Sequence, residues 1–219
     1  MKRKPRPAAR TEPWHPCAWQ VQSLLLAYPD EQSAERLSLA RRAAPALPDR
    51  VRDPLLAFTA HAERTPAAEL ATAYVATFDH RKRCCLYLTY YAHGDTRRRG
   101  IALLRLKQAY AAAGLRLADD ELPDHLAVVL EFAATEPAAG HRLLTEHRAG
   151  LELLRLALRA EDLPWAAVLE SVSATLPPLK GDEQDAVARL AAQGPPEEQV
   201  GLAPYTPPQF MPDPAGGPR

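Results

Sequence analysis

The sequence predicts an all-α protein, a single globular bundle of about eight to ten helices between two disordered termini. The 219 residues include 41 Ala and 32 Leu but only nine Val and one Ile. Helices favour the first pair, whereas strands favour β-branched residues. Proline recurs where helices should begin, and glycine or proline recurs where they should end. The apolar residues between these breaks share one helical face, which completes the argument for helices.

Both ends of the chain are predicted to be disordered. Residues 1–14 form a basic arm broken by proline, and residues 194–219 hold eight prolines and four glycines. Such compositions bury too little apolar surface to order a chain. The helical domain is therefore expected over residues 15–193, a length that suits one domain.

The first four helices are bounded by prolines or by capping residues. A helix over residues 17–28 should stop at Pro29, and a second should begin at the capping Asp30. A third is expected around residues 51–58, and a fourth follows Pro66. The apolar faces of the third and fourth carry Val51, Leu55, Leu56 and Phe58, then Leu70, Tyr74, Val75 and Phe78.

The middle of the chain contains the best-defined helix, over residues 96–113. Asp95 is expected to cap it, Gly114 lies beyond its end, and Ile101, Leu104 and Tyr110 share one side. The preceding segment, Leu86 to Tyr91, could form a short strand or a buried helical turn, and its periodicity does not decide. Further helices are expected over residues 123–135, 137–160, 164–176 and 182–193.

Charge is balanced overall but segregated along the chain. The 27 basic and 27 acidic residues give a net charge of zero, so no general attraction to nucleic acid or membrane is expected. Residues 80–110 hold eight Lys or Arg and one acid, whereas residues 119–136 hold six acids and no Lys or Arg. These blocks could pair with one another or bind a charged partner.

Motifs that would indicate an enzyme or a metal protein do not occur. The sequence contains no GxGxxG, no P-loop, no HExxH, no CxxC and no GxSxG. Three cysteines favour a reducing compartment, and Cys84 and Cys85 are interpreted as small buried residues. Apolar runs are too short for a signal peptide or a membrane span, which favours a cytoplasmic protein. We expect no catalytic residue and no bound metal or cofactor.

The segment Glu121-Leu122-Pro123-Asp124-His125 is the strongest local candidate for a site. If Pro123 begins a helix, the acids around it would interact favourably with the first turn. The same side chains could instead reach a neighbouring loop or a ligand. The residues alone leave both interpretations open.

Two segments together resemble a known family. They are Tyr74 to Asp79, leading through Cys84 and Leu86–Tyr91 to Gly94-Asp95-Thr96-Arg97, and Glu121 to Leu126. Over residues 17–180 the chain resembles the nitrate reductase molybdenum cofactor assembly chaperones of the NarJ type, also called the nitrate reductase delta subunit. These belong to the all-helical group of TorD-like and DmsD-like redox-enzyme maturation chaperones.

The resemblance implies a cytoplasmic chaperone without catalytic activity. It would bind the N-terminal peptide of the apo catalytic (alpha) subunit of respiratory nitrate reductase and assist insertion of the molybdenum cofactor and an iron–sulfur cluster before membrane docking. Molybdenum cofactor biosynthesis proteins are further candidate partners. An amphipathic client helix would need an apolar groove rimmed by charge. The expected peptide-binding residues are Phe78, Asp79, Tyr87, Tyr90, Tyr91, Glu121, Pro123, Asp124 and His125.

Three alternatives remain open at this point. The client could be another molybdoenzyme, such as a sulfoxide or N-oxide reductase. The protein could be a small acid/base enzyme that uses Asp124 and His125, although catalytic pairs depend on spatial geometry rather than on adjacency in sequence. It could also bind nucleic acid through Arg81–Arg83 and Arg97–Arg99, which the zero net charge does not favour.

Overall fold

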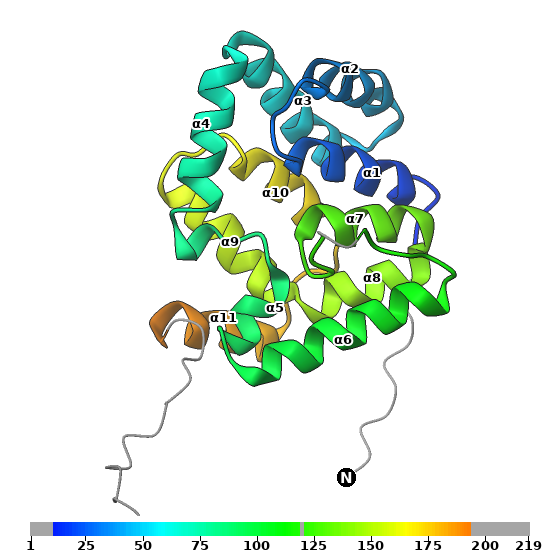
Figure 1. The fold of residues 1–219 in the computed structure, drawn as a ribbon. Helices are drawn as coiled ribbons and strands as arrows, with labels where there is room; N and C mark the ends of the chain where they lie inside the picture. The colour runs from blue at the N-terminus through cyan, green and yellow to red at the C-terminus, as the bar shows by residue number, and fades with distance from the viewer. Residues whose placement is uncertain (1–10, 119–120, 194–219) are drawn as a thin grey trace, which may run out of the picture.

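The computed structural model describes residues 11–118 and 121–193, which form eleven α-helices and two 3₁₀ helices (Figure 1). The all-α prediction is confirmed. Of the ends predicted to be disordered, residues 1–10 and 194–219 lie outside the described residues. Residues 11–14 of the predicted arm are described, and Trp14 packs against the core at the start of α1. The α-helices are α1 (His15–Leu26), α2 (Ser33–Ala43), α3 (Asp49–Arg64), α4 (Ala67–Phe78), α5 (Leu88–His93), α6 (Arg97–Ala112), α7 (Leu126–Thr135), α8 (Pro137–Glu146), α9 (Arg148–Ala160), α10 (Ala166–Ala174) and α11 (Gly181–Gln193); the 3₁₀ helices are η1 (Ala44–Ala46) and η2 (Lys82–Cys84).

The helix count exceeds the expected eight to ten for two local reasons. The predicted helix over residues 137–160 is two helices, because the chain breaks at His147, whose backbone leaves helical geometry. The undecided segment before Asp95 forms the short helix α5. Pro123 does not begin a helix, since α7 starts at Leu126 with His125 as its N-cap. That expectation was wrong by nearly one turn.

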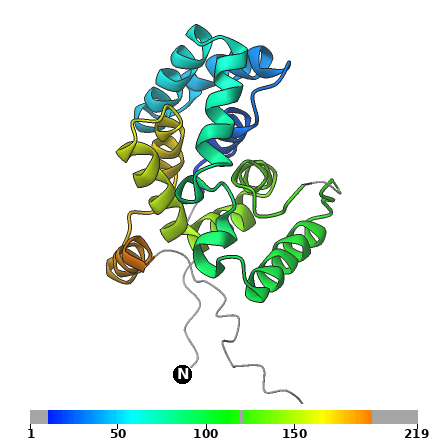
Figure 2. The same cartoon turned by 60° about the vertical axis from the view of Figure 1, so that its left-hand side comes forward.

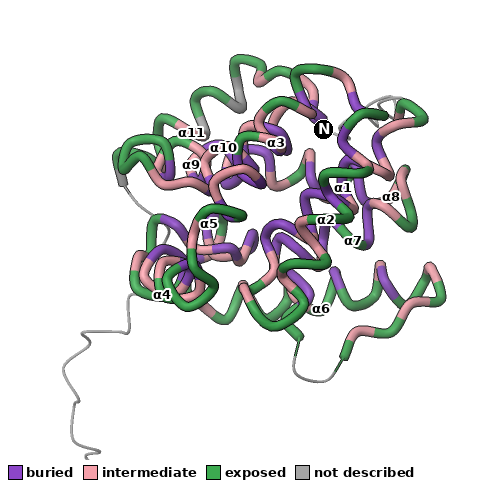
Figure 3. Tube along the Cα trace, turned by 90° about the horizontal axis from the view of Figure 1, so that it is seen from above, coloured by how far each residue is buried: buried purple, intermediate pink, exposed green. Residues whose placement is uncertain are grey.

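The core runs through the middle of the molecule, where α1 packs along α7 and α3 packs against α10. Figure 3 shows the buried residues along these inner faces. Trp19 and Trp165 are the largest fully buried side chains. The Trp165 ring lies 5.3 to 5.8 Å from the rings of Phe58, Tyr74 and Phe78. This cluster joins α3 and α4 to the start of α10.

Buried hydrogen bonds fasten α1 to α10 across a long stretch of sequence. Trp19 Nε1 donates to Thr175 Oγ1 at 3.0 Å, and Gln22 Nε2 donates to Ser171 Oγ at 2.9 Å. The Ser171 hydroxyl then donates to the carbonyl of Val51 in α3 at 2.8 Å. Because unpaired polar groups are costly in a core, these bonds select one arrangement of the three helices.

Gly140 allows α7 and α8 to approach each other closely. A Cβ atom at position 140 would lie 2.2 Å from the Cα of Ala133 in α7. No side chain can occupy that space without moving the backbone of one helix. The absence of a side chain at residue 140 therefore sets how near α8 lies to α7.

Two histidines lie in the core beside Trp19. The Nδ1 atom of His15 accepts the backbone N–H of Glu12 at 2.6 Å, and its Nε2 lies 3.1 Å from the carbonyl oxygen of Thr175. With Nδ1 as acceptor, Nε2 carries the proton and the ring is neutral. The His141 ring lies 6.1 Å away. Burial lowers the pKa of both histidines, and the charge on His15, when it is protonated, further lowers the pKa of His141.

We expect the free energy of unfolding to decrease as the pH falls below about 6.5. The folded chain holds these imidazoles neutral because their pKa values are lowered, whereas the unfolded chain takes up protons near the ordinary histidine pKa. The contribution of these neutral rings to the free energy of unfolding is fully present above the histidine pKa of the unfolded chain. It is lost as the pH falls toward the lowered pKa values of the folded chain. Urea titrations between pH 7.5 and 5.5 measure this loss. His141→Gln should show a shallower pH dependence than wild type, and the exposed His80→Gln should not.

Candidate functional site

The two segments that carry the family resemblance lie side by side in the structure. The backbone N–H of Leu88 donates to the carbonyl of Asp124 at 2.9 Å, and Leu126 donates to Leu86 at 2.8 Å. These bonds form a single antiparallel bridge between Tyr87 and His125. The rings of these two residues meet edge to face, with centroids 5.5 Å apart.

Asp124 is fully buried behind this bridge. One carboxylate oxygen, Oδ2, accepts the Thr89 hydroxyl and, at 3.3 Å, the Thr89 backbone N–H. It also lies 3.5 Å from the guanidinium of Arg99, which reaches the exposed Asp95 at 3.0 Å. The guanidinium carbon of Arg99 lies 5.4 Å from the centre of the Tyr87 ring, a cation–π distance. Asp124 thereby links the start of α5, next to Tyr87, to the start of α7, where His125 lies.

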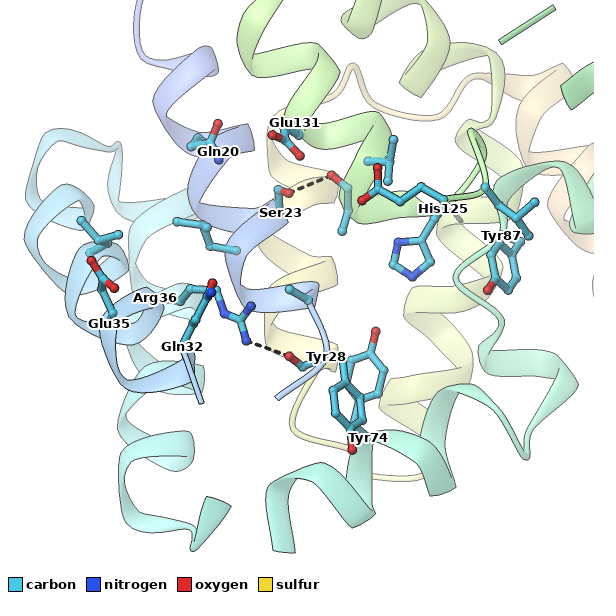
Figure 4. Close-up of a pocket in the computed structure, with 17 residues that line it drawn as sticks. Gln20, Ser23, Tyr28, Gln32, Glu35, Arg36, Tyr74, Tyr87, His125 and Glu131 are labelled. Carbon is cyan, nitrogen blue, oxygen red and sulfur yellow. Dashed lines mark hydrogen bonds between the residues drawn. The ribbon is translucent and has the colours of Figure 1, made fainter. Parts of the chain in front are cut away.

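A groove of about 670 Å³ opens in front of Tyr87 and His125. Figure 4 shows these two side chains on one side of the groove and Gln32 and Arg36 on the other. The lining comes from α1, α2, α4, α7 and the segments that contain Tyr87 and Leu122. Its residues are Gln20, Ser23, Leu24, Ala27, Tyr28, Gln32, Glu35, Arg36, Leu39, Tyr74, Tyr87, Glu121, Leu122, His125, Ala127, Val128 and Glu131.

Of the nine residues expected to bind the peptide, Tyr87, Glu121 and His125 line this groove. Pro123 is buried, and its carbonyl accepts the Tyr110 hydroxyl at 2.6 Å. Asp124 is buried as described above, and Asp79 is exposed just beyond α4. Asp79 is near enough to act on the pKa of His125.

Of the four aromatic residues among the nine, only Tyr87 lines the groove. Phe78 packs in the core against Tyr74 and Trp165. The Tyr91 hydroxyl donates to the carbonyls of Arg83 and Cys85, and the Tyr90 ring packs against Tyr91. These three side chains contact other parts of the fold and do not line the groove.

Sequence reasoning missed most of the apolar lining. Tyr28, Leu39 and Leu122 are 50%, 38% and 42% exposed and stand at the groove, although large apolar side chains are normally buried. The sequence places Tyr74 on the apolar face of the fourth helix. In the structure it also lines the groove, and its ring packs edge to face on that of Tyr28. The signal available in the sequence was Tyr28 beside Pro29 at a helix end, which places an aromatic ring near the surface.

The rim of the groove is acidic. Glu35, Glu121 and Glu131 are exposed lining residues, and Arg36 is the cation among the lining residues. The guanidinium of Arg36 is engaged, because it donates to Asp30 at 2.6 Å and to the Tyr28 carbonyl at 2.7 Å. A ligand with positive charge at the edges of an apolar face would match this pattern.

Burial favours the neutral forms of three side chains that line the groove, His125, Tyr87 and Tyr74. Burial lowers the pKa of His125, against the opposing effect of Asp124 and Asp79. Burial also raises the pKa of the Tyr87 and Tyr74 hydroxyls. No hydrogen bond joins the Asp124 carboxylate to the His125 ring, so the two do not form the pair that acid/base catalysis would require.

The described residues provide neither a metal-binding cluster nor a membrane-spanning helix. Within residues 11–118 and 121–193, no three His, Cys, Asp or Glu side chains gather in a way that could hold a metal ion. Cys17, Cys84 and Cys85 form no disulfide, and burial raises the pKa of the last two thiols. No helix in the described part of the chain is long and apolar enough to span a membrane.

The all-helical fold matches that of a protein whose crystal structure is known. The crystal structure of a proposed redox enzyme maturation protein from Archaeoglobus fulgidus superposes with a TM-score of 0.57 and covers 77% of this chain and 98% of its own. Its sequence is 21% identical, so this likeness concerns the fold. The model of the nitrate reductase delta subunit family matches residues 44–170. The chain belongs to the nitrate reductase delta subunit family.

Individual relatives agree with this assignment. NarJ of Bacillus subtilis, assigned as a nitrate reductase molybdenum cofactor assembly chaperone, is 34% identical over 156 residues, which are 70% of this chain and 85% of that protein. NarJ of Escherichia coli K12, an assembly chaperone of the same kind, is 32% identical over 120 residues, 53% of this chain and 51% of its own. These relatives are named as chaperones, which supports the prediction that the chain is not an enzyme.

A third relative is a longer protein. The nitrate reductase-like protein NarX of Mycobacterium tuberculosis H37Rv is 41% identical over 166 residues, which are 74% of this chain. The chain spans 24% of the length of NarX. The likeness to NarX therefore concerns one part of that protein.

Proposed function

We propose that this protein is a cytoplasmic chaperone for the assembly of respiratory nitrate reductase. It binds the N-terminal peptide of the apo catalytic subunit and keeps that subunit competent for insertion of the molybdenum cofactor and an iron–sulfur cluster before membrane docking. The chaperone itself holds no cofactor, and molybdenum cofactor biosynthesis proteins are candidate partners. Family membership supports the chaperone role, and the groove beside Tyr87 and His125 is the observation that supports peptide binding.

The groove suits one face of an amphipathic helix. Its volume of about 670 Å³ falls within the range of a ligand site, and Tyr28, Leu39 and Leu122 offer apolar contacts at its surface. A helix places apolar side chains at positions i, i+3, i+4 and i+7 into such a groove. Basic residues beside that apolar face would meet Glu35, Glu121 and Glu131.

Calorimetric titration with a synthetic peptide that copies the N-terminus of the catalytic subunit tests the proposal. Leu122→Lys should weaken binding roughly tenfold, because it removes an apolar contact at the groove and adds a repelling charge. Leu156→Lys is the matched control, since Leu156 is 41% exposed on α9, is outside the groove lining, and differs little in exposure from Leu122 at 42%. A wild-type protein that binds no peptide, or two variants that bind alike, would refute the groove as the site.

The alternatives are weaker for specific reasons. A different molybdoenzyme as client has no support among the relatives described above, whose names refer to nitrate reductase. A nucleic-acid surface would need the two arginine clusters to face solvent together. Arg81 instead pairs with Glu161, and Arg99 turns inward to Asp124.

A further inference from the structure

Helix α6 lies at the edge of the molecule and turns an apolar face to solvent. Among its sixteen residues, Leu106 and Tyr110 are the buried ones. Figure 2 shows α6 standing apart from the body of the helices, with its outer side uncovered by the described residues. Ile101 and Leu104 of α6 are 58% and 56% exposed. The sequence had placed these two with Tyr110 on one side, but Tyr110 points inward.

Four exposed residues of α6, three of them apolar, follow the spacing of a helix-pairing face. Ile101, Leu104, Gln108 and Ala111 are separated by three, four and three positions, and all four are exposed. We call this set the α6 seam. In heptad terms Ile101 and Gln108 are at position a, and Leu104 and Ala111 are at position d. A Cβ atom at Gly100 would meet nothing within 4 Å, so the space beside the seam is open.

Cations flank the α6 seam on both sides. Arg98 and Arg105 are at heptad position e, and Lys107 is at position g, where charged residues select the partner of a paired helix. All three are exposed, and α6 contains no Asp or Glu. Arg99 does not contribute, because its guanidinium lies against Asp95 and Asp124. No residue of α6 lines the groove.

We propose that the α6 seam is a docking surface for an acidic amphipathic helix of a partner protein. Such a helix would lay an apolar a and d row on Ile101 and Leu104 and bring Glu or Asp to the arginines and Lys107. A second copy of this chain would set cations against cations. A lipid surface favours helices with bulky aromatic residues such as Trp and Phe, and α6 presents neither outward. The surface is separate from the groove and does not depend on the proposed client.

The probe is a labelled three-heptad peptide with Ile and Leu at a and d and Glu at e and g. The comparison peptide has the same sequence with Lys in place of every Glu. In fluorescence anisotropy at low salt, the full-length protein should bind the acidic peptide about tenfold tighter than the basic one. Arg105→Glu combined with Lys107→Glu should reverse that preference. Ile101→Ser combined with Leu104→Ser should weaken binding of the acidic peptide about tenfold and leave the melting temperature unchanged, because both side chains are exposed.

Other results would overturn the proposal. One such result is equal binding of the acidic and basic peptides, and another is a preference that the Arg105→Glu and Lys107→Glu double variant does not reverse. Two further results would identify a different occupant. Sedimentation on phosphatidylglycerol vesicles without peptide binding indicates a lipid surface, and self-association abolished by Ile101→Ser with Leu104→Ser indicates a second copy. Titration of the groove with the catalytic-subunit peptide should be unchanged in all α6 variants. If the wild-type protein does not bind the catalytic-subunit peptide, that result would refute the groove as the peptide site and would leave the α6 proposal unaffected.

Discussion

Replacement of Asp124 by alanine is expected to lower the free energy of unfolding by about 3 to 5 kcal/mol. The carboxylate is fully buried and accepts both the hydroxyl and the backbone N–H of Thr89. Its removal leaves those donors without their acceptor, and the side chain of Arg99, which is only 18% exposed, loses its buried counter-charge. Urea denaturation followed by circular dichroism measures the loss.

The same arginine supplies a matched control. Arg99 also pairs with Asp95, whose side chain is 75% exposed. Asp95→Ala should cost at most about 1 kcal/mol, because an exposed ion pair contributes little. Equal losses for Asp95→Ala and Asp124→Ala would show that burial does not decide the effect.

Peptide titration separates this supporting role from direct contact. Asp124→Asn keeps an acceptor for Thr89 but removes the charge that faces Arg99. If Asp124 supports the wall of the groove, this variant should bind the peptide nearly as wild type does at a temperature where it is folded. A loss of about 10- to 150-fold with unchanged stability would instead show that Asp124 contacts the client.

The second large effect is expected from reversal of the acidic rim. Glu121→Lys combined with Glu131→Lys should weaken binding of a basic client peptide by about 10- to 100-fold at low salt. Each change replaces an attraction by a repulsion at the edge of the groove. Because both side chains are exposed, the loss should shrink as salt is added. Calorimetry at low and high salt measures both quantities.

A control with the same net charge isolates position from overall charge. Glu69 and Glu146 are exposed residues of α4 and α8 that do not line the groove. The variant Glu69→Lys with Glu146→Lys therefore has the same net charge as the rim variant and should bind nearly as wild type does. Equal losses in the two double variants would contradict an acidic rim at the groove.

Helix positions could be predicted from sequence because their signals are local. Pro66 immediately precedes α4, and Pro29 lies three residues beyond the end of α1. Of the four residues expected on one face of α4, Leu70, Tyr74 and Phe78 are buried, and Val75 is half-buried. The break at His147 was missed because the leucines of α8 and α9 continue one helical period across it. A change in helix direction leaves no trace in such a pattern.

The groove could be predicted only in part, because it depends on contacts between distant segments. The resemblance singled out Tyr87 and His125, and the backbone bridge joins them. Which aromatic residues line a groove and which fill the core depends on the neighbours of each ring. Phe78 and Tyr74 are both on α4, yet only Tyr74 reaches the groove. Residue type and spacing do not distinguish these two.

The hydrogen bonds from α1 to α10 determine when the protein can acquire its groove during synthesis. Trp19 and Gln22 bond to Thr175 and Ser171, so one wall of the groove is fastened by residues about 150 positions further along the chain. Contacts between such distant residues form late in folding. While the ribosome still holds residues 171–175, α1 lacks these partners. The nascent chain is therefore expected to lack a finished groove until translation has passed α10, and peptide binding in this groove would require that α10 has packed onto α1.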